Sequence, residues 1–144
     1  MPKATDFPTV GKVLSRDDIS VVFNPQNTNY ELKLEIGKYD GPIGQRVQGF
    51  IILSARKVYT VPSGGNFLEP IFGRPRIVQG RVKYLDEKEM VVHAGTPIIV
   101  QLPAAEDRYD LASGDLMVAS LVNVVALPGA RFLLGVEATT ARAT

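Results

Sequence analysis

The chain has 144 residues, of which 45% are hydrophobic and 22% are charged, as in an ordinary globular protein. It contains no cysteine, which excludes disulfide bonds, a thiol nucleophile and thiolate metal ligands. The formal net charge of +1 argues against a strongly basic nucleic-acid binder. No stretch approaches the roughly 20 apolar residues of a membrane helix, and the first residues lack the apolar region of a secretory signal. We therefore expect a cytoplasmic protein without a membrane partner.

Short apolar runs, separated by 13 glycines and 10 prolines, predict an all-β protein. The clearest run is Tyr30–Ile36, in which apolar and charged residues alternate, as in a strand with one buried face. Phe50-Ile51-Ile52-Leu53 and Pro97-Ile98-Ile99-Val100 are apolar throughout and predict strands that are buried more fully. Only the segment 104–111 has the composition of a helical turn.

Several short motifs recur in the same order about 65–70 positions apart. Gly11-Lys12-Val13 is echoed by Gly80-Arg81-Val82, and each is followed by an acidic pair, Asp17-Asp18 or Asp86-Glu87. The further matches are Val21-Val22-Phe23 with Val91-Val92-His93, Tyr30-x-Leu32-x-Leu34 with Ile98-x-Val100-x-Leu102, Tyr39-Asp40 with Tyr109-Asp110, Gly44-Gln45 with Gly114-Asp115, and Val61-Pro62-Ser63-Gly64 with Leu127-Pro128-Gly129. The chain therefore reads as two copies of one unit, with the boundary in Gly73-Arg74-Pro75-Arg76.

Each unit reads as three consecutive strands, a longer connection and two more strands. This order resembles the OB-fold, a small five-stranded Greek-key barrel. The resemblance implies an all-β fold of two tandem five-stranded OB-like β-barrels packed against each other. The first barrel unit would span residues 8–73 and the second residues 77–136, with 137–144 as a frayed tail.

The repeat also predicts which side chains form the core and which join the units. The matched core positions are Val13, Val22, Leu32, Leu34 and Ile52 in the first unit and Val82, Val92, Val100, Leu102 and Val122 in the second. Just before the boundary lies a run of large apolar residues, and we expect Phe67, Leu68, Ile71 and Phe72 to pack between the two units. Because each small barrel is marginal alone, we expect the chain to unfold in one transition.

No motif in the sequence predicts enzyme chemistry. His93 is the only histidine, it has no partner set for a metal, and the repeat places it on a strand, at the position of Phe23. The acidic pairs Asp17-Asp18 and Asp86-Glu87 fall in tight turns, where aspartate caps backbone N–H groups. No nucleophile elbow and no phosphate-binding glycine loop occur. We therefore expect no enzymatic activity, no cofactor and no metal.

Charge and aromatic residues point to one candidate contact surface. Residues 1–78 hold ten basic and seven acidic side chains, whereas residues 79–144 hold six basic and eight acidic ones. Cations and aromatics are combined in two short runs of the first part, as in surfaces that bind phosphates and stack on bases. The predicted contact residues are Arg56, Lys57, Tyr59, Arg74 and Arg76. In the alternative interpretation, both arginines lie on a solvated linker while Tyr59 and Phe72 fill the gap between the barrels.

Three functions follow from these observations, in order of preference. The first is a non-enzymatic binding or assembly module, whose protein or nucleic-acid partner and whose homo-oligomerisation stay open. The second is single-stranded nucleic-acid binding by the first barrel, where Phe23 and Tyr30 would stack on bases. The third arises because residues 111–120 resemble the end of tandem molybdate-binding (Mop-type) barrels, which implies binding of a small oxyanion.

Overall fold

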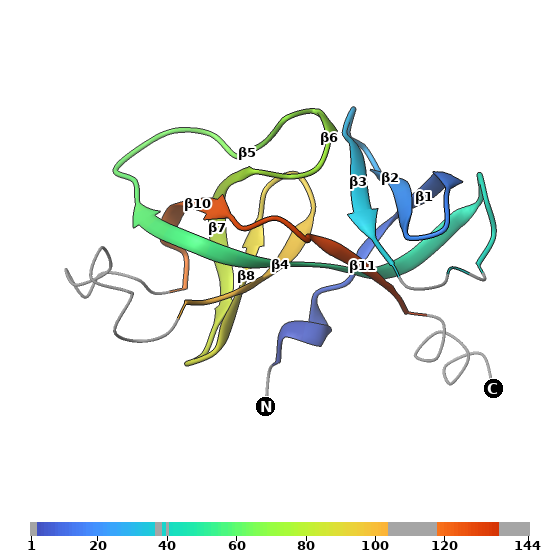
Figure 1. Cartoon of the computed structure of the whole chain (residues 1–144). Coiled ribbons are helices and arrows are strands. Elements are labelled where there is room, and N and C mark those ends of the chain that lie inside the picture. Colours follow the sequence, from blue (N-terminus) through green and yellow to red (C-terminus); the bar gives the residue numbers. More distant parts are fainter. Residues whose placement is uncertain (1–2, 37–38, 40, 104–117, 136–144) are drawn as a thin grey trace.

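The computed structural model describes residues 3–36, 39, 41–103 and 118–135, and it consists of strands and one short 3-10 helix, η1 (Ala4–Asp6). In chain order the strands are β1 (Thr9–Arg16), β2 (Ser20–Pro25), β3 (Glu31–Glu35), β4 (Arg46–Thr60), β5 (Phe67–Glu69), β6 (Phe72–Gly73), β7 (Ile77–Leu85), β8 (Glu89–His93), β9 (Pro97–Gln101), β10 (Leu121–Ala126) and β11 (Arg131–Leu134) (Figure 1). The predicted all-β class is confirmed. The predicted helical turn at 104–111, the tail at 137–144 and the repeat motifs at 109–115 lie outside the described residues.

Strand β3 shows how the sequence pattern produces this architecture. Leu32 and Leu34 are fully buried, whereas the two glutamates of the strand are exposed. Successive side chains of a strand point to opposite faces, so an alternating sequence buries one face and solvates the other. The strand predicted at Tyr30–Ile36 is present and one residue shorter at each end.

Five strands close a first circuit of backbone pairings. β1, β2 and β3 are consecutive antiparallel neighbours, and the first half of β4 pairs antiparallel with β1. β11 completes the circuit, because it pairs antiparallel with β4 and parallel with β3, where Arg131 lies opposite Glu35. The last strand of this circuit therefore comes from the far end of the described chain.

A second circuit repeats this arrangement with the other strands. β7, β8 and β9 are consecutive antiparallel neighbours, and β10 pairs antiparallel with β7. The second half of β4 lies between β10 and β9, antiparallel to β10 and parallel to β9, where Ile52 is opposite Ile99. β4, which is 15 residues long, thus belongs to both circuits.

The centre of β4 is buried on both faces, as its unbroken apolar sequence predicts. Ile51 and Leu53 belong to the main hydrophobic cluster. Phe50 and Ile52 point the other way, into a smaller cluster whose remaining buried members are Ala4, Val91 and Ile99. Because Ala4 belongs to η1, the start of the described chain covers the outer side of β4, β8 and β9.

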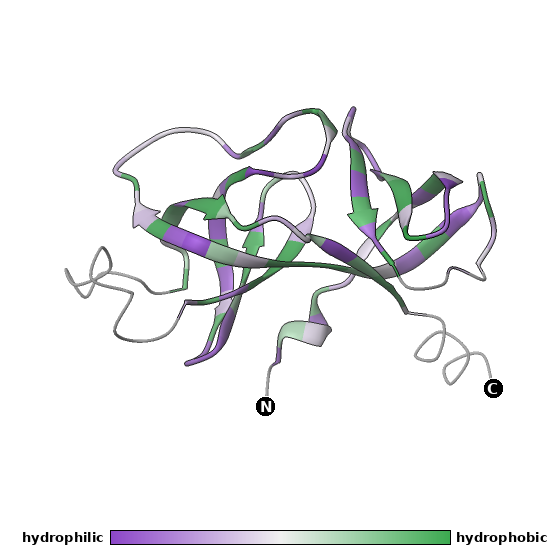
Figure 2. Cartoon of the chain, viewed as in Figure 1, coloured by the Kyte–Doolittle hydropathy of each residue, from purple (hydrophilic) through white to green (hydrophobic). Residues whose placement is uncertain are grey.

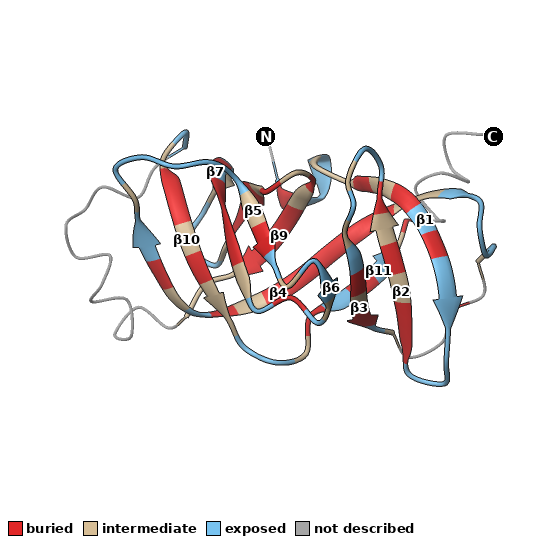
Figure 3. Cartoon of the chain, turned by 90° about the horizontal axis from the view of Figure 1, so that it is seen from above, coloured by how far each residue is buried: buried red, intermediate tan, exposed pale blue. Residues whose placement is uncertain are grey.

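The main core is continuous across the two circuits. It includes Phe23 and Phe132 of the first circuit, whose rings stack with centroids 4.7 Å apart, as well as Val82 and Val92 of the second. Hydrophobic and buried residues lie along the strands of both (Figures 2 and 3). Of the ten predicted core positions eight are buried, and the other two, Val22 and Leu102, are half-buried.

The first hairpins of the two circuits share their irregularities. The β1–β2 register shifts between Val13 and Ser15, and the β7–β8 register shifts between Val82 and Tyr84. These registers correct the predicted correspondence on the second strand by one residue. Val13 pairs with Phe23 and Val82 pairs with Val92, so Phe23 rather than Val22 matches Val92.

The segment before β7 bridges the circuits through its backbone. β5 pairs with β7, and β6 pairs with β3. Leu68 is buried and Phe67 is half-buried, but Ile71 and Phe72 are 49% and 64% exposed. The prediction that all four side chains fill an interface is therefore wrong for Ile71 and Phe72. The reason is that the two-residue strand β6 joins the edge of β3 through its backbone, which leaves both side chains at the surface.

Candidate binding groove

A groove of about 450 Å³ lies between two connecting segments of the chain. One wall is the end of the bridging segment and the first residue of β7, and the other is the end of β10 with the turn that follows. The lining residues are Arg74, Pro75, Arg76, Ile77, Val125, Ala126, Leu127, Pro128 and Gly129. Aliphatic side chains and prolines thus form most of the surface, and two arginines supply the charge.

Backbone hydrogen bonds hold the two walls together. The N–H of Ala126 donates to the carbonyl of Arg76 at 2.9 Å, which joins one wall to the other. The Arg76 N–H in turn donates to the backbone carbonyl of Glu69 at 2.8 Å. The Leu127 N–H donates to the backbone carbonyl of Ser54 of β4, also at 2.8 Å. The walls are therefore fixed to β4 and β5 on either side, and the groove is a built feature of the fold.

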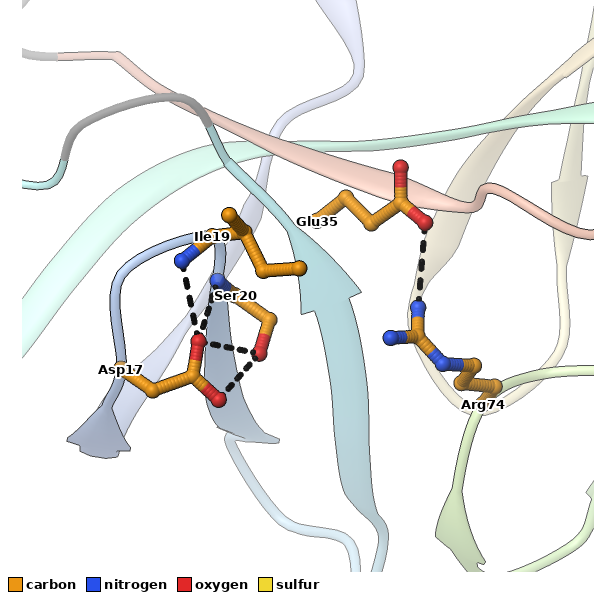
Figure 4. Close-up of polar contacts among 5 residues, drawn as sticks. All are labelled: Asp17, Ile19, Ser20, Glu35 and Arg74. Carbon is orange, nitrogen blue, oxygen red and sulfur yellow. Dashed lines mark hydrogen bonds and ion pairs between the residues drawn. The ribbon is translucent and has the colours of Figure 1, made fainter.

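The two arginines of the groove differ in their surroundings. The guanidinium of Arg74 forms an exposed ion pair with Glu35 of β3 at 3.2 Å (Figure 4). Within the described residues, the Arg76 side chain has no hydrogen bond or ion pair, and it is exposed. Exposed ion pairs contribute little to stability, so Arg74 can also exchange Glu35 for another anion. Arg76 is available to an incoming anion without losing a partner.

The structure separates the five predicted contact residues into two groups. Arg74 and Arg76 line the groove, whereas Arg56, Lys57 and Tyr59 lie on β4 and do not. Lys57 is opposite the groove residue Val125 in the β4–β10 ladder, and Tyr59 is opposite Asn123. The second group thus lies on the strand next to one wall. Whether any of the five residues binds a ligand stays a prediction.

The predicted aromatic positions have mixed outcomes. Phe72 is 64% exposed and Tyr59 is 36% exposed, so the interpretation that they fill a gap between two units is wrong. Phe23, in contrast, is fully buried and stacked on Phe132, so its ring cannot receive a base. Tyr30 is half-buried, and its hydroxyl accepts a hydrogen bond from the Leu68 N–H at 2.9 Å. The predicted stacking surface of Phe23 and Tyr30 is therefore not formed.

The acidic turns have the structural role that the sequence predicts for them. Asp17 accepts hydrogen bonds from the N–H groups of Ile19 and Ser20, each at 2.9 Å, and from the Ser20 hydroxyl (Figure 4). These hydrogen bonds lower the pKa of Asp17, and the bond from the Ile19 N–H makes the largest contribution. Asp86 caps its own turn through the N–H groups of Lys88 and Glu89, at 2.7 and 2.9 Å.

Asp86 has a further partner that Asp17 lacks. The hydroxyl of Tyr84 donates to the Asp86 carboxylate, which lowers the pKa of Asp86 and raises the pKa of Tyr84 to about 12. Both carboxylates are charged acceptors at neutral pH, and neither is protonated as a general acid requires. Among the described residues, no three His, Asp or Glu side chains gather as a metal site would need. His93 lies half-buried on β8, opposite Arg81.

One wall of the groove was not foreseen from the sequence. Val125 belongs to no motif, and Leu127 and Pro128 belong only to the repeated turn motif Leu127-Pro128-Gly129. None of the three carries a charge, so nothing in their residue types indicates a site. The only signal was the Pro128-Gly129 pair directly after an apolar strand, because such a pair ends the strand and leaves Leu127 at the surface. Leu127 is 42% exposed. The run that resembles Mop-type barrels, 111–120, lies mostly outside the described residues.

Comparison with known protein families, with curated proteins and with solved structures finds no match for this chain. In the part of the chain that the structure describes, no helix has the length and apolar character needed to cross a membrane.

Proposed function

We propose that the protein is a non-enzymatic binding module made of two OB-like barrels, in which β11 closes the first barrel and the second half of β4 closes the second. Three features support the barrels: each circuit is a three-stranded meander, it is closed by two further strands, and it contains one parallel contact, β3–β11 or β9–β4. The shared shift in the first hairpin and the shared aspartate cap support a common plan for the two units. The proposed division at residues 8–73 and 77–136 then needs one change, because β11 and half of β4 serve the opposite unit.

The groove is the observation that carries the proposed binding function. Ligand sites are typically concave, about 300–1,000 Å³ in volume and mostly apolar, with a few polar groups that orient the ligand. The groove has a volume of about 450 Å³, an aliphatic lining and two arginines. It therefore suits a ligand with an apolar body and a negative charge.

An apolar anion tests this site directly. Anilinonaphthalene sulfonate carries an aromatic body and a sulfonate, and its fluorescence rises when it leaves water for an apolar site. We expect saturable binding to the native protein. Arg76→Glu should weaken binding about tenfold, because it places a carboxylate where the sulfonate binds, and Leu127→Ser should weaken it by removing apolar contact.

The chain offers a matched control for each variant. Arg46→Glu makes the same charge reversal at an exposed position of β4, and Leu14→Ser removes a leucine that is 40% exposed on β1. Neither residue lines the groove. If the dye binds all four variants as it binds the native protein, the groove is not a binding site and the proposal is wrong.

Single-stranded nucleic-acid binding is a second candidate, favoured by the exposed aromatic rings. Phe72 precedes Arg74 and Arg76 by two and four positions, and Tyr59 follows Arg56 and Lys57. Rings of this kind stack on bases while cations contact phosphates. A fluorescein-labelled oligothymidylate should then bind at about 50 mM salt, with an affinity that falls steeply as salt is added. Removing both groove arginines should flatten the slope by about one unit per lost phosphate contact.

A further inference from the structure

We infer that the groove binds an extended protein segment in which a carboxylate lies next to large aliphatic side chains. This inference rests on the proposed function, because it names the ligand class of the same groove. The first step concerns the size of the surface. Ile71 and Phe72 lie outside the groove but on the chain segment that forms its first wall, and they are 49% and 64% exposed. Exposed apolar side chains on a segment that also lines a pocket are typical of interaction sites for macromolecules.

The second step separates a peptide from a nucleic acid. Among the described residues, those that line the groove include no aromatic side chain on which a base could stack. Ile77, Val125 and Leu127 instead offer aliphatic contacts, which suit aliphatic side chains. The exposed residue Glu69 also lies next to the site, since it pairs with the lining residue Ile77 in the β5–β7 ladder. A polyphosphate backbone would be repelled there, whereas one carboxylate can reach Arg76.

The third step concerns the arginines. A carboxylate and a guanidinium form two parallel hydrogen bonds, a geometry that an arginine with a free side chain can adopt. Arg76 has such a side chain within the described residues. Arg74 also lines the groove, but its guanidinium is already paired with the Glu35 carboxylate at 3.2 Å, so part of its positive charge is neutralised. The site therefore accommodates one or two negative charges and not a long series of them.

Selection from random peptides displayed on phage tests the inference without knowledge of the natural partner. The intact chain is immobilised, and bound peptides are sequenced and then measured by fluorescence anisotropy. We expect enrichment of peptides that combine Asp or Glu with Leu, Ile or Val. Their affinity should fall about tenfold or more with Arg76→Glu and with Leu127→Ser, and should stay unchanged with Arg46→Glu and Leu14→Ser.

The other outcomes overturn the inference in distinguishable ways. If the dye binds the groove but no peptide is enriched, or if enriched peptides tolerate Arg76→Glu, the groove is a ligand site for another class and the inference is wrong. If oligothymidylate binds and Arg76→Glu abolishes its binding while no peptide is enriched, the ligand is a nucleic acid. If neither dye nor peptide binds, the proposed function fails together with the inference.

Discussion

At the scale of single residues, the clearest physical account is that of the two aspartate caps. Asp17 and Asp86 each accept two backbone N–H groups from the residues two and three positions ahead. Short acidic side chains favour this turn because they replace a backbone partner that the tight turn cannot supply. Residue type and position were therefore enough to predict the caps from the sequence. The added bond from Tyr84 to Asp86 could not be predicted from the residue types alone, because it depends on how the two side chains are oriented in the folded hairpin.

The bond between Tyr84 and Asp86 predicts a pH dependence. It raises the pKa of Tyr84 from 10.0 to about 12 in the folded protein. A group whose pKa is raised on folding stabilises the fold fully below its unfolded pKa, and this stabilisation is lost as the pH rises through the folded pKa. Between pH 10 and about 12, native protein should therefore lose more stability than Tyr84→Phe. Urea unfolding at several pH values measures the difference.

A second measurement tests the cause of the shift. Asp86→Ala should return the pKa of Tyr84 towards its ordinary value, followed by the absorbance of the phenolate and assigned with Tyr84→Phe. Asp17→Ala is the matched control, because it removes the equivalent cap from the first hairpin, whose corresponding residue is Ser15. An unchanged Tyr84 titration in Asp86→Ala would show that the hydrogen bond is not the cause.

At the scale of elements, alternation and apolar runs predicted individual strands well. The segment Tyr30–Ile36 and the centre of β4 were both foreseen because burial depends on local pattern. The positions of Ile71 and Phe72 were not, because the sequence does not show that a two-residue strand attaches to the edge of β3. The sequence did not predict a groove: it singled out Arg74 and Arg76 by their charge, whereas the residues of the apolar wall carry no such signal.

The repeated glycines Gly11 and Gly80 give a prediction about paired strands. A Cβ on Gly11 would collide with the carbonyl oxygen of Asn24, and a Cβ on Gly80 would collide with that of His93. Both glycines lie where the first strand of a circuit pairs on each side, so neither backbone can retreat. We expect Gly80→Ala to lower the free energy of unfolding by about 1–3 kcal/mol.

The control for this prediction is Gly65→Ala. A Cβ at Gly65 has no neighbouring atom within 4 Å, and its change should stay within about 0.5 kcal/mol. Urea denaturation of the two variants gives the comparison. Equal stability of Gly80→Ala and Gly65→Ala would mean that the strands move apart at little cost, and that the recurrence of glycine in both motifs has another reason.

At the scale of the whole molecule, the decisive feature is the long-range pairing of β4 and β11. The sequence suggested two contiguous units because its motifs recur in order, and a recurring motif says nothing about which copy of a strand completes which circuit. In the structure, β10 pairs with β7 in the second circuit, and β11, the next strand along the chain, pairs with β4 in the first. The connection between Ala126 and Arg131 thus returns the chain from the second circuit to the first.

This long-range pairing predicts how the chain behaves when it is cut. A fragment of residues 1–73 lacks β11, and a fragment of residues 78–144 lacks β4, so each loses the strand that closes its circuit. An open circuit exposes unpaired backbone groups and half of a core that is continuous in the intact chain. We therefore expect the intact chain to unfold in one transition and neither fragment to fold alone. An equimolar mixture should regain native circular dichroism, because each fragment carries the strand that the other lacks. Thermal unfolding of the chain, the separate fragments and the mixture measures this. Two fragments that each fold with the stability of the intact chain would contradict this pairing.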